Sequence, residues 1–174
     1  MVSFEFLAVT ISILGLAASI TYYAIILNNA NKTQKLQLET RQLQIFMQLN
    51  NILNTKESLK DLIELLNTKV DEEEYRQKYD SYVNPEHFAK RGNLWYTYNS
   101  IGELLRLKIV DPDLLQRLNV DSNVILMWEK WGHIIKMNRE KEQMPDLWDG
   151  FEYLYNEMKA LRNKMGYPEI IYEP

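Results

Sequence analysis

An uncharged run near the N-terminus constrains this chain more than any other feature. From Phe6 to Asn31 there is no Asp, Glu, Lys or Arg, and Phe6–Leu27 reads FLAVTISILGLAASITYYAIIL. Roughly 22 helical residues reach about 33 Å, which is enough to span the hydrocarbon core of a bilayer. We therefore expect a transmembrane helix whose membrane-spanning residues include Phe6, Leu7, Ile13, Leu14, Gly15, Leu16, Ile20, Ile25, Ile26 and Leu27.

Two other interpretations of this run stay open. A cleavable signal peptide has a basic start and an apolar stretch of about 7–15 residues. This chain has no basic residue before Phe6, and its apolar stretch is longer. A buried core helix of a soluble protein is the second alternative.

The charges that follow the run predict its direction across the membrane. Lys32, Lys35 and Arg41 are basic, and only Glu39 opposes them. Basic residues favour the cytoplasmic side of a transmembrane helix. We expect a single-pass protein of the cell membrane with its N-terminus outside and its C-terminal domain in the cytoplasm.

Small residues recur along one face of the predicted span. Ala8, Ser12, Gly15 and Ser19 follow alternating steps of four and three residues. Small residues at this spacing let two transmembrane helices approach closely. A homodimer is therefore a hypothesis, with this face as the contact between helices.

The remainder of the chain predicts one all-α domain. We divide the chain into an anchor with its juxtamembrane segment (1–31), a cytoplasmic helical domain (32–166) and a C-terminal tail (167–174). Apolar positions at helical spacing and polar start signals predict a bundle of about six helices. We expect the anchor helix to continue to about Asn54 and the apolar tail to dock on the domain.

Start signals and apolar spacing place the other helices. Capping signals are predicted at Asn54–Glu57, Val70–Tyr75, Asn84-Pro85, Asp111-Pro112 and Asp121 or Ser122, and Met144–Asp146 is expected to break a helix. Gly102, in the middle of a helix, predicts close approach of another backbone. The expected buried faces are Leu59, Leu62, Ile63 and Leu66; Phe88, Trp95, Tyr98, Ile101 and Leu105; Val124, Met127, Trp128, Trp131, Ile134 and Ile135; and Trp148, Phe151, Tyr155, Met158 and Leu161.

Composition excludes several classes of function. The 174 residues carry a net charge of −4, which provides no basic surface for nucleic acid. There is no cysteine, so disulfides and thiol chemistry are absent. No phosphate-binding loop, nucleophile elbow or metal-binding helix motif occurs, and we expect no cofactor.

Two constellations nevertheless remain candidates for chemistry. Glu129 and His133 are four residues apart on one predicted helix face, as in a fragment of a metal site or an acid–base pair. Trp128, Trp131 and Tyr153 are candidates for an aromatic cleft that binds a ligand. The acidic run Asp71–Glu74 suits a helix start, with a divalent-cation site as the alternative, and Lys90-Arg91 is interpreted as solvated helix surface.

Three stretches resemble a family of uncharacterised, membrane-anchored, all-helical proteins of archaea and bacteria, a domain of unknown function. They are Glu39–Gln48 (ETRQLQIFMQ), Trp128–Ile135 (WEKWGHII) and Phe151–Met158 (FEYLYNEM). The resemblance covers about residues 4–165 and implies the architecture described above without a reaction or catalytic residue. His133 stands where proline is common in that family.

The leading interpretation is a binding module at the cytoplasmic membrane face, a scaffold or signalling protein rather than an enzyme. Its expected partners are the lipid bilayer and a protein of unknown identity. The alternatives are a metal-dependent or carboxylate-based enzyme or regulator that uses Glu129 and His133, and a small-ligand sensor that uses the aromatic cleft.

Overall fold

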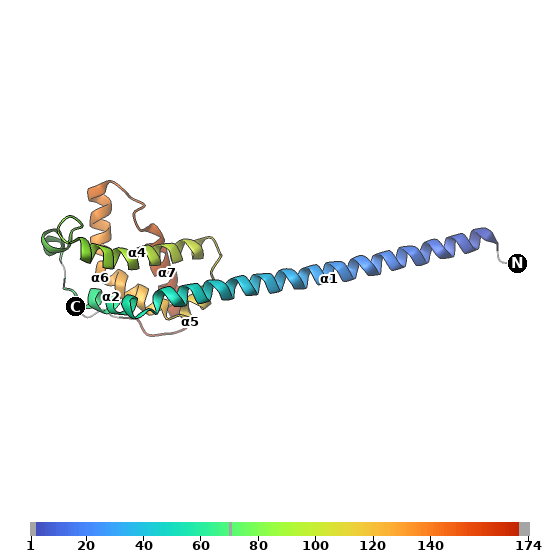
Figure 1. The fold of residues 1–174 in the computed structure, drawn as a ribbon, viewed down its shortest axis with the longest axis horizontal. Coiled ribbons are helices and arrows are strands. Elements are labelled where there is room, and N and C mark those ends of the chain that lie inside the picture. Colours follow the sequence, from blue (N-terminus) through green and yellow to red (C-terminus); the bar gives the residue numbers. More distant parts are fainter. Residues whose placement is uncertain (1–2, 70, 171–174) are drawn as a thin grey trace. The chain divides into compact units, whose positions relative to one another are not determined.

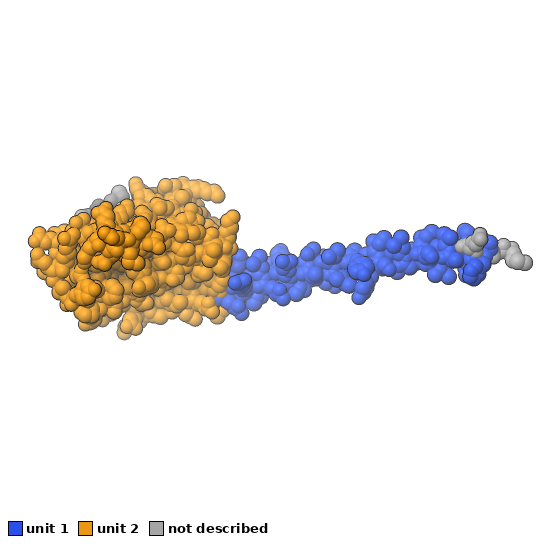
Figure 2. All heavy atoms as spheres, turned by 90° about the horizontal axis from the view of Figure 1, so that it is seen from above, with its two compact units in different colours: residues 1–44 blue, residues 45–174 orange. Residues whose placement is uncertain are grey.

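The computed structural model describes residues 3–69 and 71–170, and within them the only regular secondary structure is helical. The helices are α1 (Phe4–Leu53), α2 (Lys56–Asn67), α3 (Glu72–Glu74), the π-helix η1 (Tyr75–Tyr79), α4 (Pro85–Arg106), α5 (Pro112–Arg117), α6 (Val120–Glu142) and α7 (Asp149–Lys164) (Figure 1). The chain divides into two compact units, Met1–Gln44 and Ile45–Pro174 (Figure 2). The all-α prediction is confirmed.

The first unit consists of the N-terminal part of α1. The helix contains no proline and continues to Leu53, as expected from a sequence without breakers. All four Ser and Thr side chains of Phe6–Leu27 donate to the carbonyl oxygen four residues earlier: Thr10, Ser12, Ser19 and Thr21, at 2.8–2.9 Å. The Ser and Thr hydroxyls of the apolar segment are thus satisfied by its own helix.

The second unit is built around α4, α6 and α7. Residues of α6 fill the centre: Val124, Met127, Trp128, Trp131, Ile134 and Ile135 are all buried, as predicted. Phe151, Leu154 and Met158 of α7 are fully buried against them, whereas Trp148, Tyr155 and Leu161 are only partly buried.

Two glycines allow α4 and α7 to pack closely. A Cβ atom built on Gly102 would lie 1.8 Å from the carbonyl oxygen of Gly150. A Cβ atom on Gly150 would lie 2.5 Å from the carbonyl oxygen of Asn99. The close approach predicted at Gly102 is therefore confirmed, and its partner is the backbone at the start of α7.

Most helix starts follow the predicted capping signals. Asn84 accepts from the amide of His87 at 3.0 Å, and Asp111 accepts from that of Asp113 at 2.8 Å. Asp71 accepts from the amide of Glu74, which gives the acidic run a capping role; Val70 lies outside the described residues. At the start of α2 the cap is Thr55 rather than Asn54.

The predicted cap at Asp121 or Ser122 is wrong. α6 begins at Val120, after Asn119 in the left-handed conformation, and α6 has no side-chain cap. Asp121 is buried, and its carboxylate forms an ion pair with Arg162 of α7, whose Nη1 donates to it at 2.7 Å. The carboxylate serves a tertiary contact instead of a local one.

The predicted buried face of α2 is also partly wrong. Leu59 and Ile63 are exposed at 40% and 59%, whereas Leu62 and Leu65 are buried. The helix is apolar on more than one face, and α4 and α6 cover the face that contains Leu62 and Leu65. Phe88 of α4, also expected in the core, is 41% exposed.

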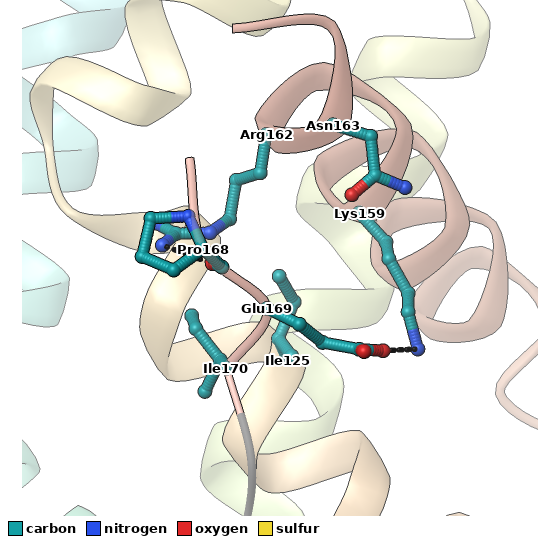
Figure 3. A pocket seen from close by; sticks show the side chains of 7 residues that line it. All are labelled: Ile125, Lys159, Arg162, Asn163, Pro168, Glu169 and Ile170. Carbon is teal, nitrogen blue, oxygen red and sulfur yellow. Dashed lines mark hydrogen bonds and ion pairs between the residues drawn. The ribbon is translucent and has the colours of Figure 1, made fainter. Parts of the chain in front are cut away.

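The described part of the C-terminal tail packs on the helices of the second unit, to which it belongs, as its apolar residues suggested. Residues 171–174 lie outside the described residues. Ile170 packs on the core, and Arg162 donates to the carbonyl oxygen of Pro168 at 3.3 Å. Glu169 pairs with Lys159 at 3.4 Å (Figure 3). The recess between the tail and α7 has a volume of about 10 Å³, which leaves room for no more than about one water molecule.

Candidate functional site

The first candidate surface is the apolar segment of α1 in the first unit. An 18-residue window within Phe6–Leu53 has a mean hydropathy of 1.9, and 0% of that window is buried. Nine of the ten predicted membrane-spanning residues are large and apolar, with exposed fractions between 42% and 65%: Phe6, Leu7, Ile13, Leu14, Leu16, Ile20, Ile25, Ile26 and Leu27. Among the described residues, α1 alone is long and apolar enough to cross a membrane.

The predicted contact face of this segment is open. Ala8, Ser12, Gly15 and Ser19 are all exposed. A Cβ atom built on Gly15 would have no neighbour within 4 Å. The same alternating steps lead to Leu36, Thr40 and Leu43, also exposed and also within the first unit, so one continuous face of the helix is uncovered.

The structure does not pair Glu129 with His133. The Glu129 carboxylate accepts a hydrogen bond from the Tyr155 hydroxyl and another, at 3.1 Å, from Lys159 of α7. These bonds lower the pKa of Glu129 below its usual value. His133 is exposed on α6. Within the described residues, no group of three or more His, Asp or Glu side chains has an arrangement that could hold a metal ion.

The predicted aromatic cleft is not formed. Trp131 is fully buried and its indole donates to the carbonyl oxygen of Leu65 at 3.3 Å, while Trp128 is only 5% exposed. The guanidinium of Arg106 lies over the ring of Tyr153, with its carbon 4.8 Å from the ring centroid. Both tryptophans face the core because their spacing continues the apolar stripe of α6.

A buried arginine was missed by the sequence interpretation. Lys90 does lie at the surface and pairs with Glu64 at 2.9 Å. Arg91, expected beside it as solvated surface, is 0% exposed. The signal was present: Arg91 fills the position between Phe88 and Trp95 in the core spacing of α4, where an apolar residue would be expected.

Arg91 is surrounded by aromatic and neutral polar groups. Its Nη1 lies 2.9 Å from Nδ1 of His87, and its Nη2 donates to the hydroxyl of Tyr75 at 3.1 Å. The rings of Tyr75, Phe88 and Trp95 lie 4.9, 5.4 and 5.6 Å from its guanidinium carbon. We call Tyr75, His87, Arg91 and Trp95 the Arg91 cluster.

Electrostatics keep the histidine of this cluster neutral. Burial, and then the neighbouring Arg91 charge, lower the pKa of His87 to about 4. At neutral pH Nδ1 therefore accepts a hydrogen from Arg91, and the remaining ring hydrogen lies on Nε2. Burial also lowers the pKa of Arg91, although an arginine stays charged at neutral pH.

Three polar atoms of the cluster have no hydrogen-bond partner among the described residues. They are Nε2 of His87, Nε of Arg91 and Nε1 of Trp95. Among the described residues, no carboxylate oxygen lies within 4.0 Å of a nitrogen of Arg91. The cluster also uses Tyr75 of the π-helix η1, a kind of element often found at functional sites.

Comparisons with known proteins bear on this architecture. A family model, "Domain of unknown function (DUF4760)", matches residues 4–158. The match includes the apolar segment of α1, the Arg91 cluster and most of α7. Neither the curated proteins nor the solved structures compared with this chain give a match. Because the matched region spans most of its length, the chain belongs to the DUF4760 family.

Proposed function

We propose that this chain is a single-pass membrane protein whose helical second unit acts in the cytoplasm by binding a protein partner, as a scaffold or signalling module. The observation that carries the membrane assignment is the apolar surface of Phe6–Leu27, which no part of the described chain covers. Its Ser and Thr hydroxyls bond within the helix, so the side chains offer lipid few unsatisfied polar groups.

The energetics of insertion support this assignment. Eleven residues of Phe6–Leu27 are Leu, Ile, Val or Phe. At the helix centre each favours insertion by about 0.3–0.6 kcal/mol, which sums to about 3–6 kcal/mol. Tyr22 and Tyr23 lie near the end of the segment, where aromatic residues suit a membrane interface. A core helix would bury this surface, whereas 0% of the window is buried.

The charge pattern supports the cytoplasmic placement. Lys32, Lys35 and Arg41 all follow the apolar segment within the first unit. Glu39, the acidic residue among them, lies 3.9 Å from Lys35 in an exposed pair and leaves a net positive charge. Basic residues close to the span favour the cytoplasmic side.

A homodimer through α1 is a second proposal, supported by the continuous uncovered face. Gly15 and Ser19 present small side chains in the predicted span, and Leu36 and Leu43 continue the same face beyond it. Small residues permit close packing in lipid, and the alternation of four and three residues suits a left-handed pair of helices.

Single-cysteine labelling tests the topology, because the natural chain has no cysteine to interfere. Ser3→Cys and Glu140→Cys are made separately, and intact cells receive a membrane-impermeant maleimide. We expect labelling of Ser3→Cys in intact cells and labelling of Glu140→Cys only after the membrane is permeabilised. Labelling of Glu140→Cys in intact cells would contradict the cytoplasmic placement.

The binding role is tested by cross-linking in native membranes, followed by purification under denaturing conditions. A protein cross-linked reproducibly to the full chain, and absent when only residues 1–44 are expressed, supports binding through the second unit. Recovery of the same protein with residues 1–44 alone would contradict it. For the dimer, Gly15→Leu is expected to reduce cross-linked dimer, with Ala17→Leu as the matched control.

A further inference from the structure

We propose that the Arg91 cluster is a binding site for a small oxyanion, a carboxylate or a phosphate group. The site does not depend on the membrane assignment, because all of its residues lie in the second unit. Three independent features lead to this proposal: the uncompensated charge, the character of the unpartnered atoms, and the thin cover over the guanidinium.

The first feature is a buried positive charge without a local counter-charge. Arg91 is 0% exposed, and its hydrogen-bond partners are the neutral His87 ring and the hydroxyl of Tyr75, neither of which is a carboxylate. Asp80 acts on it only through longer-range electrostatics and lies 3.5 Å from Lys141, with which it pairs. A buried ion without a partner costs several kcal/mol, and a bound anion would offset that cost.

The aromatic rings compensate only part of this charge. Each cation–π contact contributes about 0.5–2 kcal/mol, depending on how fully it is desolvated. Ring faces also leave the N–H edges of the guanidinium unsatisfied, because a cation above a ring does not use hydrogen-bond directions. An oxyanion supplies both the opposite charge and the acceptors that the planar guanidinium matches.

The second feature is that every unpartnered atom of the cluster is a donor. Arginine Nε and tryptophan Nε1 can only donate. Nε2 of His87 carries the ring hydrogen, because Nδ1 accepts from Arg91. A metal ion needs lone pairs, and none of these three atoms offers one, whereas an oxyanion accepts hydrogen bonds from donors of this kind. The Nε2–H of His87 points away from Arg91, because the ring turns Nδ1 toward the guanidinium, so the contacts we assign to the anion are Nε of Arg91 and Nε1 of Trp95. The donor set therefore selects an anion over a cation.

The third feature is the cover of the site. The Phe88 ring lies 5.4 Å from the guanidinium carbon and is 41% exposed, so a side chain in contact with Arg91 reaches the surface. Tyr79 of η1 packs on the His87 ring at 4.4 Å and is itself only partly buried. Rotation of Phe88 would open the cluster to a group of a few atoms.

Nuclear magnetic resonance on the full chain in non-ionic detergent tests the site directly. Sodium acetate and inorganic phosphate are titrated separately at constant ionic strength, and the indole N–H signals are followed. Trp95→Phe assigns the Trp95 signal. We expect a saturable shift of this signal and of the Arg91 Nε–H, with the Trp128 indole as the internal control outside the cluster. Acetate saturation indicates a carboxylate site, and phosphate saturation indicates a phosphate site.

Variants establish whether the arginine carries the binding. Arg91→Gln is expected to weaken binding at least tenfold, whereas Arg117→Gln, which changes an exposed arginine of α5, leaves it unchanged. If Arg91→Gln does not fold, Trp95→Phe removes one donor but keeps the charge, and binding followed at the Arg91 Nε–H should weaken about fivefold. No saturable shift with either ion in the natural sequence, or undiminished affinity in these variants, would overturn the proposal.

Discussion

Gly102 of α4 and Gly150 of α7 lie where the backbones of the two helices are in contact. A Cβ atom at Gly102 would lie 1.8 Å from the Gly150 carbonyl oxygen, which no rotamer change can relieve because the obstacle is backbone. The absence of both side chains therefore determines how closely α4 and α7 pack, and this pair contributes much of the core of the second unit.

Gly102→Ala is expected to lower the free energy of unfolding by about 3 kcal/mol or more, since overpacking alone costs about 1–3 kcal/mol and here a backbone must move. Gly92→Ala is the matched control on the same helix. A Cβ at Gly92 meets nothing within 4 Å, and alanine in a helix interior gains about 0.5–1 kcal/mol over glycine. Chemical unfolding followed by circular dichroism measures both. Equal effects of the two substitutions would contradict the close contact.

Asp121→Asn is expected to destabilise the second unit by about 3–5 kcal/mol, because it leaves the Arg162 charge without its buried partner. The two side chains are only 5% and 15% exposed, and their atoms lie 2.7 Å apart. Glu142→Gln breaks an exposed pair with Lys141 and should change stability by less than about 1 kcal/mol. Comparable losses for both variants in thermal unfolding would show that burial of the Asp121 pair has no special effect.

Stability should fall as the pH decreases from about 6.5 to 4. The pKa of His87 is about 4 in the folded chain, against an ordinary value of 6.5, so in this window the unfolded chain binds more protons. The loss is at most about 1.4 kcal/mol per pH unit. Arg91 and Lys90 oppose protonation of His87, Glu64 favours it, and Tyr79 and Trp131 pack on its ring.

The control for this pH dependence is the second histidine. His87→Gln should flatten the dependence between pH 6.5 and 4, whereas His133→Gln, at an exposed position, should leave it intact. Unfolding midpoints measured across this range in both variants decide the matter. A dependence that disappears only in His133→Gln would show that His87 is not its source.

Leu65→Ala is expected to cost about 2–5 kcal/mol, because it opens a cavity in the core, whereas Ile63→Ala should cost less than about 1 kcal/mol. Leu65 is 0% exposed and Ile63 is 59% exposed on the same helix. Denaturant midpoints of the two variants test the face of α2 that packs inward. A larger loss for Ile63→Ala would restore the face that the apolar pattern first suggested.

The helix starts and the buried face of α6 could be predicted from the sequence, because residues close together in the chain determine them. Asn84-Pro85 and Asp111-Pro112 locate two helix starts, and the spacing of Trp128 and Trp131 identifies the buried face of α6. Gly102 was recognisable because an isolated glycine in a helix interior needs a packing reason.

The remaining features depend on partners far along the chain. An aspartate at position 121 could serve either as a local cap or as a partner for a distant arginine, and no neighbouring residue shows that it pairs with Arg162. Leu59 and Leu62 are equally apolar, so only the position of α4 and α6 selects between the faces of α2. The environment of Arg91 is formed by Tyr75, 16 residues earlier, and by side chains whose packing follows from the fold.

Extraction of membranes with alkaline carbonate tests the membrane assignment most directly. We predict that the full chain stays in the membrane pellet with its N-terminus intact. Leu14→Arg combined with Ile20→Arg should release it, because an arginine at the helix centre costs about 2.5–3.5 kcal/mol. Leu38→Arg, at an exposed apolar position outside Phe6–Leu27, should not. Release of the unaltered chain, or its recovery cleaved within the apolar segment, would contradict the account.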